Sequence, residues 1–212
     1  MRALDIFAGP AARAHLDQHG LLPQHITALP AAAGGPKGLI LGPLDRYLFG
    51  HWLPKSNQTV HLVGASIGAW RMAAACLDQP QHMLERLERD YIGQHYALQP
   101  GEKRPAAARV SALFAENLQA FFGGRVAEVL RHSRYRLHVV TSRGRGLLKR
   151  ERSGLTLAGY LGAFASNVVA RRALGAWLDR VVFSSHQAGV GQMSQLPFDP
   201  RDYPTHQVAL TE

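Results

Sequence analysis

The stretch "TVHLVGASIGAW", residues 59 to 70, decides the fold, because an apolar run meets a turn of small residues and then a second apolar segment. The run "TVHLV" (59 to 63) suits a short buried strand, and "AWRMAAACL" (69 to 77) suits an apolar helix. The small residues of "GASIG" (64 to 68) therefore predict a sharp strand-to-helix turn with Ser66 at its apex.

The same order of elements occurs upstream of this stretch. The small apolar residues of "HITALPAAA" (25 to 33) predict a strand, "GGPKG" (34 to 38) predicts a loop, and apolar residues recur at helical spacing over 39 to 50. Two successive strand, turn and helix units indicate an α/β fold with a mostly parallel sheet and helices on both faces, that is, three α/β/α layers.

Downstream of the turn, segments with the periodicity of a helix alternate with segments with the periodicity of a strand. We expect an amphipathic helix with Asp78 as its N-cap and Pro80 in its first turn, a helix over 106–122, a strand over 134–141, a basic loop over 143–154, a helix over 155–178, a strand over 180–184 and a loop from 185 onward. No internal repeat or linker divides the sequence, so we expect residues 1–212 to belong to a single domain.

The charge of the chain is strongly positive. Its 24 Lys and Arg against 15 Asp and Glu give a formal net charge of +9, which favours anionic partners such as lipid head groups or nucleic acid. Eight basic residues between 131 and 152 predict peripheral contact with an anionic membrane, or else a solvated loop without a partner. Nucleic acid is not expected, because Tyr135 is the segment's only Phe, Trp or Tyr and offers no stacking platform.

The cysteine content and the N-terminal sequence indicate in which cellular compartment the protein is expected. The single Cys76 cannot form an internal disulfide or a cysteine metal cluster, and we expect no metal and no cofactor. In "MRALDIFAGP" (1 to 10), Asp5 and the Gly9-Pro10 break interrupt what would have to be the apolar core of a signal peptide. We therefore expect a cytoplasmic protein without a spanning helix, whose membrane contact, if any, is peripheral.

Ser66 has two interpretations. Small residues on both sides let a sharp turn expose the serine hydroxyl, while the backbone N–H of Ile67, at a helix N-terminus, points toward a developing oxyanion. In the alternative, Ser66 is a turn residue that caps the following helix. Capping does not account for glycine at both Gly64 and Gly68.

The loop "GGPKG" is a second candidate for chemistry. Glycines allow positive φ and close approach, so a glycine-rich loop that leads into a helix presents several N–H groups to an anion. A phosphate-binding P-loop is excluded, because Lys37 precedes Gly38 and Leu39 follows it; the glycine intervals also differ from those of the dinucleotide-binding fingerprint. A loop without a ligand remains the alternative. Since the sites of open α/β sheets lie at the carboxyl ends of strands, we expect this loop beside Ser66.

Together, "GGPKG" and "GASIG" resemble the paired motifs of the patatin-like phospholipases, serine acyl hydrolases with a G-G-x-[RK]-G loop followed a few tens of residues later by G-x-S-x-G. This resemblance implies a patatin-like fold and cleavage of phospholipid or acylglycerol carboxylic esters. It assigns Ser66 as nucleophile, with Gly64 and Gly68 beside it in the elbow. The oxyanion hole would be built from the backbone of Gly34, Gly35, Lys37 and Gly38, with Ile67 at the helix start.

The family's base is the aspartate of a D-G-[GA] motif, and none of the eight aspartates of this chain is followed by glycine. The resemblance therefore implies that these residues form the N-terminal part of a longer family sequence. Asp199 and Asp202, in "FDPRDYP" (198 to 204), are possible substitutes, although Asp-Pro segments more often form turns.

Two alternatives from other classes stay open. An α/β-hydrolase triad in the order Ser, acid, His could combine Ser66 with Asp179 or Asp199 and with His186 or His206. A non-catalytic α/β module that binds lipids or anions could instead keep the glycine loop without a base.

Overall fold

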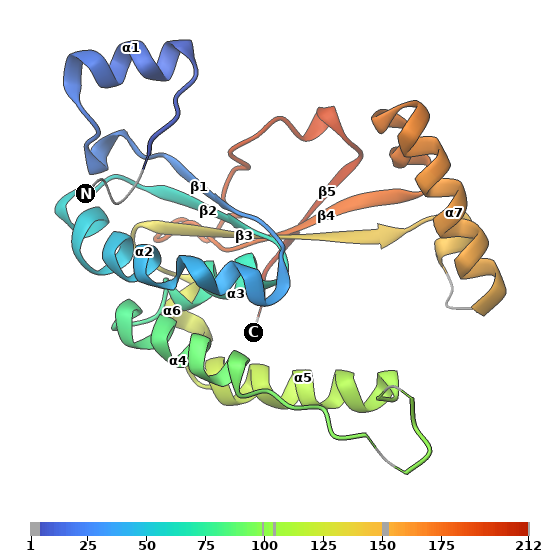
Figure 1. Cartoon of the computed structure of the whole chain (residues 1–212). Helices are drawn as coiled ribbons and strands as arrows, with labels where there is room; N and C mark the ends of the chain where they lie inside the picture. The colour runs from blue at the N-terminus through green and yellow to red at the C-terminus, as the bar shows by residue number, and fades with distance from the viewer. Residues whose placement is uncertain (1–4, 99, 104, 150–152, 212) are drawn as a thin grey trace.

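The computed structural model describes residues 5–98, 100–103, 105–149 and 153–211, and within them five strands form one twisted sheet (Figure 1). The strands are β1 (Ala28–Ala31), β2 (Val60–Gly64), β3 (Tyr135–Gly144), β4 (Leu178–Ser184) and β5 (Thr205–Ala209), in spatial order β1-β2-β3-β4-β5. Neighbouring strands pair in parallel except β3 and β4, which are antiparallel. The predicted α/β fold with a mostly parallel sheet is confirmed.

The α-helices are α1 (Pro10–His19), α2 (Gly42–Tyr47), α3 (Ile67–Ala74), α4 (Pro80–Ile92), α5 (Ala107–Phe122), α6 (Val126–Leu130) and α7 (Ser153–Val169). The helix expected over 39–50 is divided among a 3₁₀ helix (Gly35–Leu41), α2 and a π-helical turn (Leu48–Trp52). No helix in the described part of the chain is both long and apolar enough to cross a bilayer.

Helices α2 to α6 all lie on one face of the sheet (Figure 1). The strands turn alternate side chains toward them, because Val60 and Leu62 of β2 and Leu137 of β3 belong to the same buried cluster as the apolar faces of α3, α4 and α5. The segment 185–204 lies over the opposite face (Figure 1), so the described residues form a sheet with one helical layer, and the expectation of three α/β/α layers is wrong for them.

Several sequence-based expectations at element boundaries are wrong. The region from 185 onward contains β5, and β3 continues to Gly144, into the expected basic loop. The helix expected over 155–178 ends at Val169, and α1 and α6 were not anticipated.

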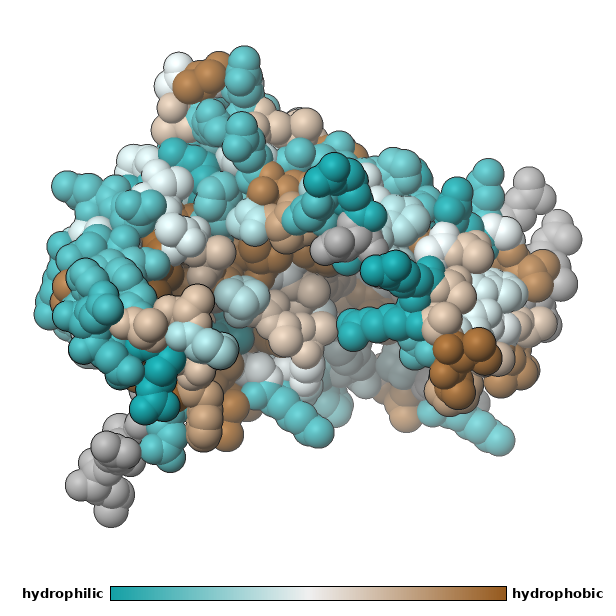
Figure 2. Space-filling model, turned by 90° about the horizontal axis from the view of Figure 1, so that it is seen from above, coloured by the Kyte–Doolittle hydropathy of each residue, from teal (hydrophilic) through white to brown (hydrophobic). Residues whose placement is uncertain are grey.

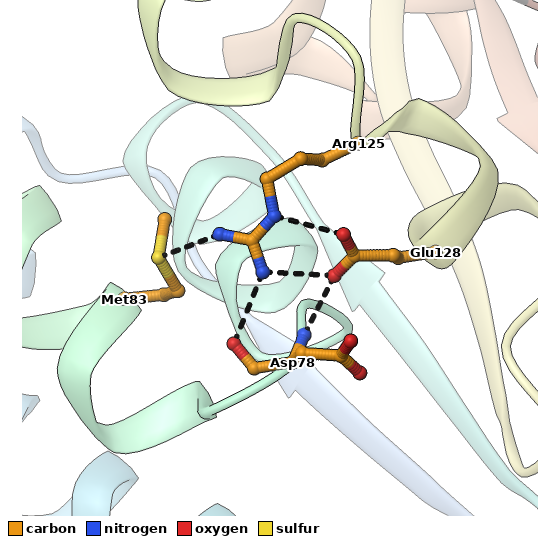
Figure 3. Close-up of polar contacts among 4 residues, drawn as sticks. All are labelled: Asp78, Met83, Arg125 and Glu128. Atoms are coloured by element: carbon orange, nitrogen blue, oxygen red, sulfur yellow. Dashed lines mark hydrogen bonds and ion pairs between the residues drawn. The ribbon is translucent and has the colours of Figure 1, made fainter.

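Asp78 is not the N-cap of α4. The cap is Gln79, in a left-handed conformation with φ 58° and without a side-chain cap hydrogen bond. The Asp78 backbone N–H donates to the carboxylate of Glu128 (2.7 Å), which also accepts from the Arg125 guanidinium (Figure 3). Arg125 reaches the Asp78 carbonyl and the Met83 sulfur as well, so this segment is held by α6 rather than by its own side chain.

A chain of polar side chains crosses the other face of the sheet from β2 to β5. His61 Nδ1 lies 2.9 Å from His138 Nε2, His138 Nδ1 lies 2.9 Å from Ser184 Oγ, and the Gln207 amide donates to Ser184 Oγ (2.9 Å). Since Ser184 accepts from Gln207, its own hydroxyl is free to donate to His138, whose Nε2–H then donates to His61. Every hydrogen bond in this chain has a donor and an acceptor when His61 and His138 are both neutral.

Low pH is expected to destabilise the fold through His138. Burial, followed by the neighbouring His61, lowers its pKa from 6.5 to about 4, so the unfolded chain binds this proton first and stability is lost as the pH falls from about 6.5 toward 4. Between about pH 7.5 and about pH 5, urea unfolding should show a loss of stability that is smaller by about 2 kcal/mol in His138→Gln than in the wild type, while His132, whose pKa burial also lowers to about 4, contributes its own loss in both proteins. The exposed His82→Gln variant should keep the wild-type difference; an unchanged difference in His138→Gln would refute this role.

Candidate active site

Ser66 has a backbone conformation that few non-glycine residues adopt. It lies between the end of β2 and the start of α3 with φ 53° and ψ −128°. Its side chain makes no capping hydrogen bond to α3, which contradicts the capping interpretation, and Ser66 Oγ has no hydrogen-bond partner among the described residues. An exposed hydroxyl on a strained backbone is typical of a functional position.

The glycines on both sides of Ser66 are required by crowding. A Cβ on Gly68 would lie 2.2 Å from the carbonyl oxygen of Ala31, at the end of β1. A Cβ on Gly64 would lie 2.5 Å from the Cα of Ala69. Neither contact could be relieved by a side-chain rotation, because both partners are backbone atoms. The interpretation of "GASIG" as a tight strand-to-helix elbow therefore agrees with its geometry.

The glycine loop lies against this elbow, as the strand order predicts. A Cβ on Gly38 would lie 2.7 Å from Cγ2 of Ile67, so the loop packs on the first residue of α3. Farther along, the Arg71 guanidinium of α3 donates two hydrogen bonds to the buried carboxylate of Asp45 in α2, at 2.6 and 2.7 Å. The loop thus packs on the elbow, and an ion pair joins the two helices that follow them.

Not every amide of the predicted oxyanion hole is available. In the 3₁₀ helix that begins at Gly35, the amides of Lys37 and Gly38 fall within the i to i−3 hydrogen-bond pattern. The amides of Gly34 and Gly35 precede that pattern, and the N–H of Ile67, the first residue of α3, has no hydrogen-bond partner among the described residues. The free donors are therefore fewer than the motif alone indicates.

Ser66 opens onto a cleft of about 350 Å³ between α3, α4 and α5. Five of its thirteen lining residues are aromatic. The lining comprises Ser66, Ile67, Trp70, Arg86, Leu87, Asp90, Tyr91, Gln94, Tyr96, Phe114, Asn117, Ala120 and Phe121. The residues from α4 and α5 were expected on amphipathic surface helices and were not assigned to a site. The apolar periodicity of those helices was the available signal, but it does not say which residues face a cavity.

Asp90 is the only carboxylate among the described residues that line the cleft. Its Oδ2 accepts a hydrogen bond from Arg86 Nε (3.2 Å), and Arg89 Nε lies 3.6 Å from Oδ1. Both carboxylate oxygens of Asp90 therefore face guanidinium groups of α4.

The other candidate acids and histidines lie elsewhere. Asp179 and His206 are paired (3.6 Å), but on β4 and β5, and Asp179 also binds Arg143 and Arg145. His186 lines a separate hollow beside Arg131. The described lining of the Ser66 cleft contains none of these residues.

The substitute bases proposed in "FDPRDYP" also lie away from Ser66. Asp199 caps a 3₁₀ helix (Pro200–Asp202) and binds Arg201, and it lines a hollow with Val140 and Phe198. The side chain of Asp202 lies outside the described part. In that part, no group of three or more His, Cys, Asp or Glu is arranged to hold a metal ion.

The basic residues between 131 and 152 are divided between the two ends of β3. Arg134 donates to the Leu53 carbonyl and the buried Arg136 donates to the His132 carbonyl, both near the start of the strand. Arg143 and Arg145 lie at its far end, next to the exposed Lys149. Arg150 and Arg152 fall outside the described residues. The segment does not form one continuous surface.

Comparisons with known proteins identify no relative. No family model, no curated protein and no solved structure matches the chain. The site has to be interpreted from its own geometry.

Strain at Ser66 predicts an unusual order of stability. Ser66→Gly should be more stable than Ser66→Ala by about 1 kcal/mol, because glycine adopts this positive φ without the cost that alanine retains. At Ser142, an exposed strand residue, the same two substitutions should give the opposite order. Urea unfolding of the four variants measures both differences, and equal stability of the two Ser66 variants would argue against strain.

Proposed function

We propose that this protein is a serine acyl hydrolase that cleaves carboxylic esters of lipids, phospholipids or acylglycerols, with Ser66 as nucleophile. The observation that carries the proposal is the elbow itself, an exposed, strained serine beside a glycine loop and at the wall of an apolar cleft. The paired motifs resemble those of patatin-like phospholipases. A patatin-like domain, which would add a second helical layer to the sheet, belongs to the same proposal.

The reaction that suits this arrangement is acyl transfer to Ser66 followed by hydrolysis. Ser66 Oγ attacks the ester carbonyl as its proton passes to a general base, and the carbonyl oxygen becomes an oxyanion. The amides of Gly34, Gly35 and Ile67 are the donors that the loop and the elbow leave free, and α3 adds its N-terminal dipole. The alcohol leaves, and water attacks the acyl-enzyme to release the acid.

The cleft supports a substrate with an apolar acyl chain. Trp70 stacks edge-on with Phe114 and Phe121, at ring centroid distances of 5.5 and 6.0 Å, and these rings continue the wall that begins at Ser66. Burial of an alkyl chain on such a wall gains about 0.8 kcal/mol for each methylene group. Long-chain esters should therefore bind better than acetyl esters.

A lipid-binding module without catalysis is the second candidate. It is favoured by one observation, that Ser66 Oγ has no hydrogen-bond partner among the described residues while Asp90 is engaged by Arg86. The two candidates differ in the reactivity of Ser66, and the cleft would hold an acyl chain in either.

Ser66 Oγ is expected to attack the phosphorus of an alkyl fluorophosphonate, which releases fluoride as the hydroxyl loses its proton and leaves a phosphonyl-serine adduct. Intact-mass spectrometry should show one adduct on the wild type and on Ser142→Ala, a control at another exposed serine, and none on Ser66→Ala. If the folded wild type is labelled no more than Ser66→Ala, the catalytic proposal is wrong and the binding module is favoured.

The variant Asp90→Asn tests whether Asp90 is the general base or only a residue of the cleft wall. We expect this variant to lower the labelling rate less than tenfold, because Arg86 already holds the carboxylate. A loss of about 10²- to 10⁴-fold would instead identify Asp90 as the base. Asp17→Asn, at an exposed carboxylate of α1, controls for the change in net charge.

A further inference from the structure

Helix α7 presents its bulky apolar face to solvent and its small residues to the protein. Its outward residues recur at helical spacing and form one stripe. They are Leu157, Tyr160, Leu161, Phe164 and Val168, each more than 60% exposed. Ordinary surface helices have the opposite arrangement, with the apolar stripe toward the core.

The inward face of α7 is fixed by close packing. A Cβ on Gly162 would lie 2.4 Å from the Trp177 ring, and one on Gly159 would lie 2.7 Å from Leu148. The Trp177 indole N–H donates to Ser166 Oγ, which itself donates to the Gly162 carbonyl. Rotation of α7 to bury its apolar stripe would break these contacts, so the exposed face is the stable one.

Basic residues flank α7 in the sequence. Arg143, Arg145 and Lys149 precede it and Arg171 and Arg172 follow it, all of them exposed. Asp179 pairs with Arg143 and Arg145, whereas the other three form no ion pair with a described residue. The sequence from 153 to 178 contains no Asp or Glu. Insertion of apolar side chains and attraction of nearby basic residues to anionic lipids are the two contributions that hold a helix in the surface of an anionic bilayer.

We propose that α7 docks this protein on anionic lipid bilayers, with Leu161 and Phe164 inserted among the acyl chains and Arg171 and Arg172 on the lipid phosphates. Figure 2 shows apolar side chains at the end of the molecule where α7 lies. Charge favours a bilayer over a second copy of the chain, because a second copy carries the same net charge of +9, whereas anionic lipids are complementary to it. The proposal concerns a surface, and it does not require Ser66 to be reactive.

Vesicle flotation of the whole chain tests the proposal, with Ser66→Ala as the parent protein so that hydrolysis cannot change the lipids. Vesicles that contain phosphatidylglycerol in phosphatidylcholine should bind the parent at least tenfold better than pure phosphatidylcholine. Replacement of Arg171 and Arg172 by Gln should weaken binding about fivefold for each charge. The control variants Arg13→Gln and Arg201→Gln, at exposed arginines outside α7 and the Ser66 cleft, should bind like the parent.

The apolar stripe is tested separately from the charges. Phe164→Ser should weaken binding to anionic vesicles about tenfold, whereas Val190→Ser, at an exposed apolar residue outside α7, should not change it. Equal binding of Phe164→Ser and the parent overturns the proposal. A parent that is dimeric in sedimentation and becomes monomeric in Phe164→Ser also overturns it, in favour of a second copy as the occupant.

A fluorescent label reports insertion even if Phe164→Ser folds poorly. Cys76 is buried, so Leu161→Cys provides one accessible thiol for an environment-sensitive nitrobenzoxadiazole dye. Its emission should increase and shift to the blue on addition of anionic vesicles, whereas the same dye on Val190→Cys should not respond. Identical spectra for both positions overturn the assignment to α7, whatever the outcome of Ser66 labelling.

Discussion

The close approach of α3 to the end of β1 is the constraint on which the candidate site depends. Gly68 lies so near the Ala31 carbonyl that any side chain at this position would overlap a backbone oxygen. Because α3 begins at this distance, the chain must turn within two residues of Gly64, and Ser66 is placed at the apex with a positive φ. The exposed hydroxyl follows from backbone packing, and the proposed reaction at Ser66 depends on that position.

The same packing brings a second element into the site. The glycine loop follows β1, which is parallel to β2, so both strands deliver their loops to one edge of the sheet. Gly38 then contacts Ile67, and the buried pair of Asp45 and Arg71 joins the two helices that follow. Removal of one partner from such a pair costs about 3 to 5 kcal/mol, since the other charge is left buried, so the pair specifies how the loop sits on the elbow.

Local features of this fold were predictable from sequence, and non-local ones were not. β2, the elbow and α3 form one continuous segment whose turn residues and apolar periodicity were sufficient to predict them. β5 was missed because "THQVA" is short and largely polar, and it is stabilised by pairing with β4 and by the contact of Gln207 with Ser184. The cleft was missed for a similar reason, since α4 and α5 meet Trp70 only after the chain has folded.

Strain at Ser66 requires a scaffold that holds β2 from both sides, because a strained residue persists only where its surroundings over-determine it. On one face, Val60 and Leu62 are fully buried beneath the helices. On the other, His61 is hydrogen-bonded to His138, the first link of a chain that reaches Gln207. Protonation of those histidines would loosen the second support while leaving the first intact. The polar chain, although it lies on the opposite face from the cleft, therefore contributes to the geometry of the elbow.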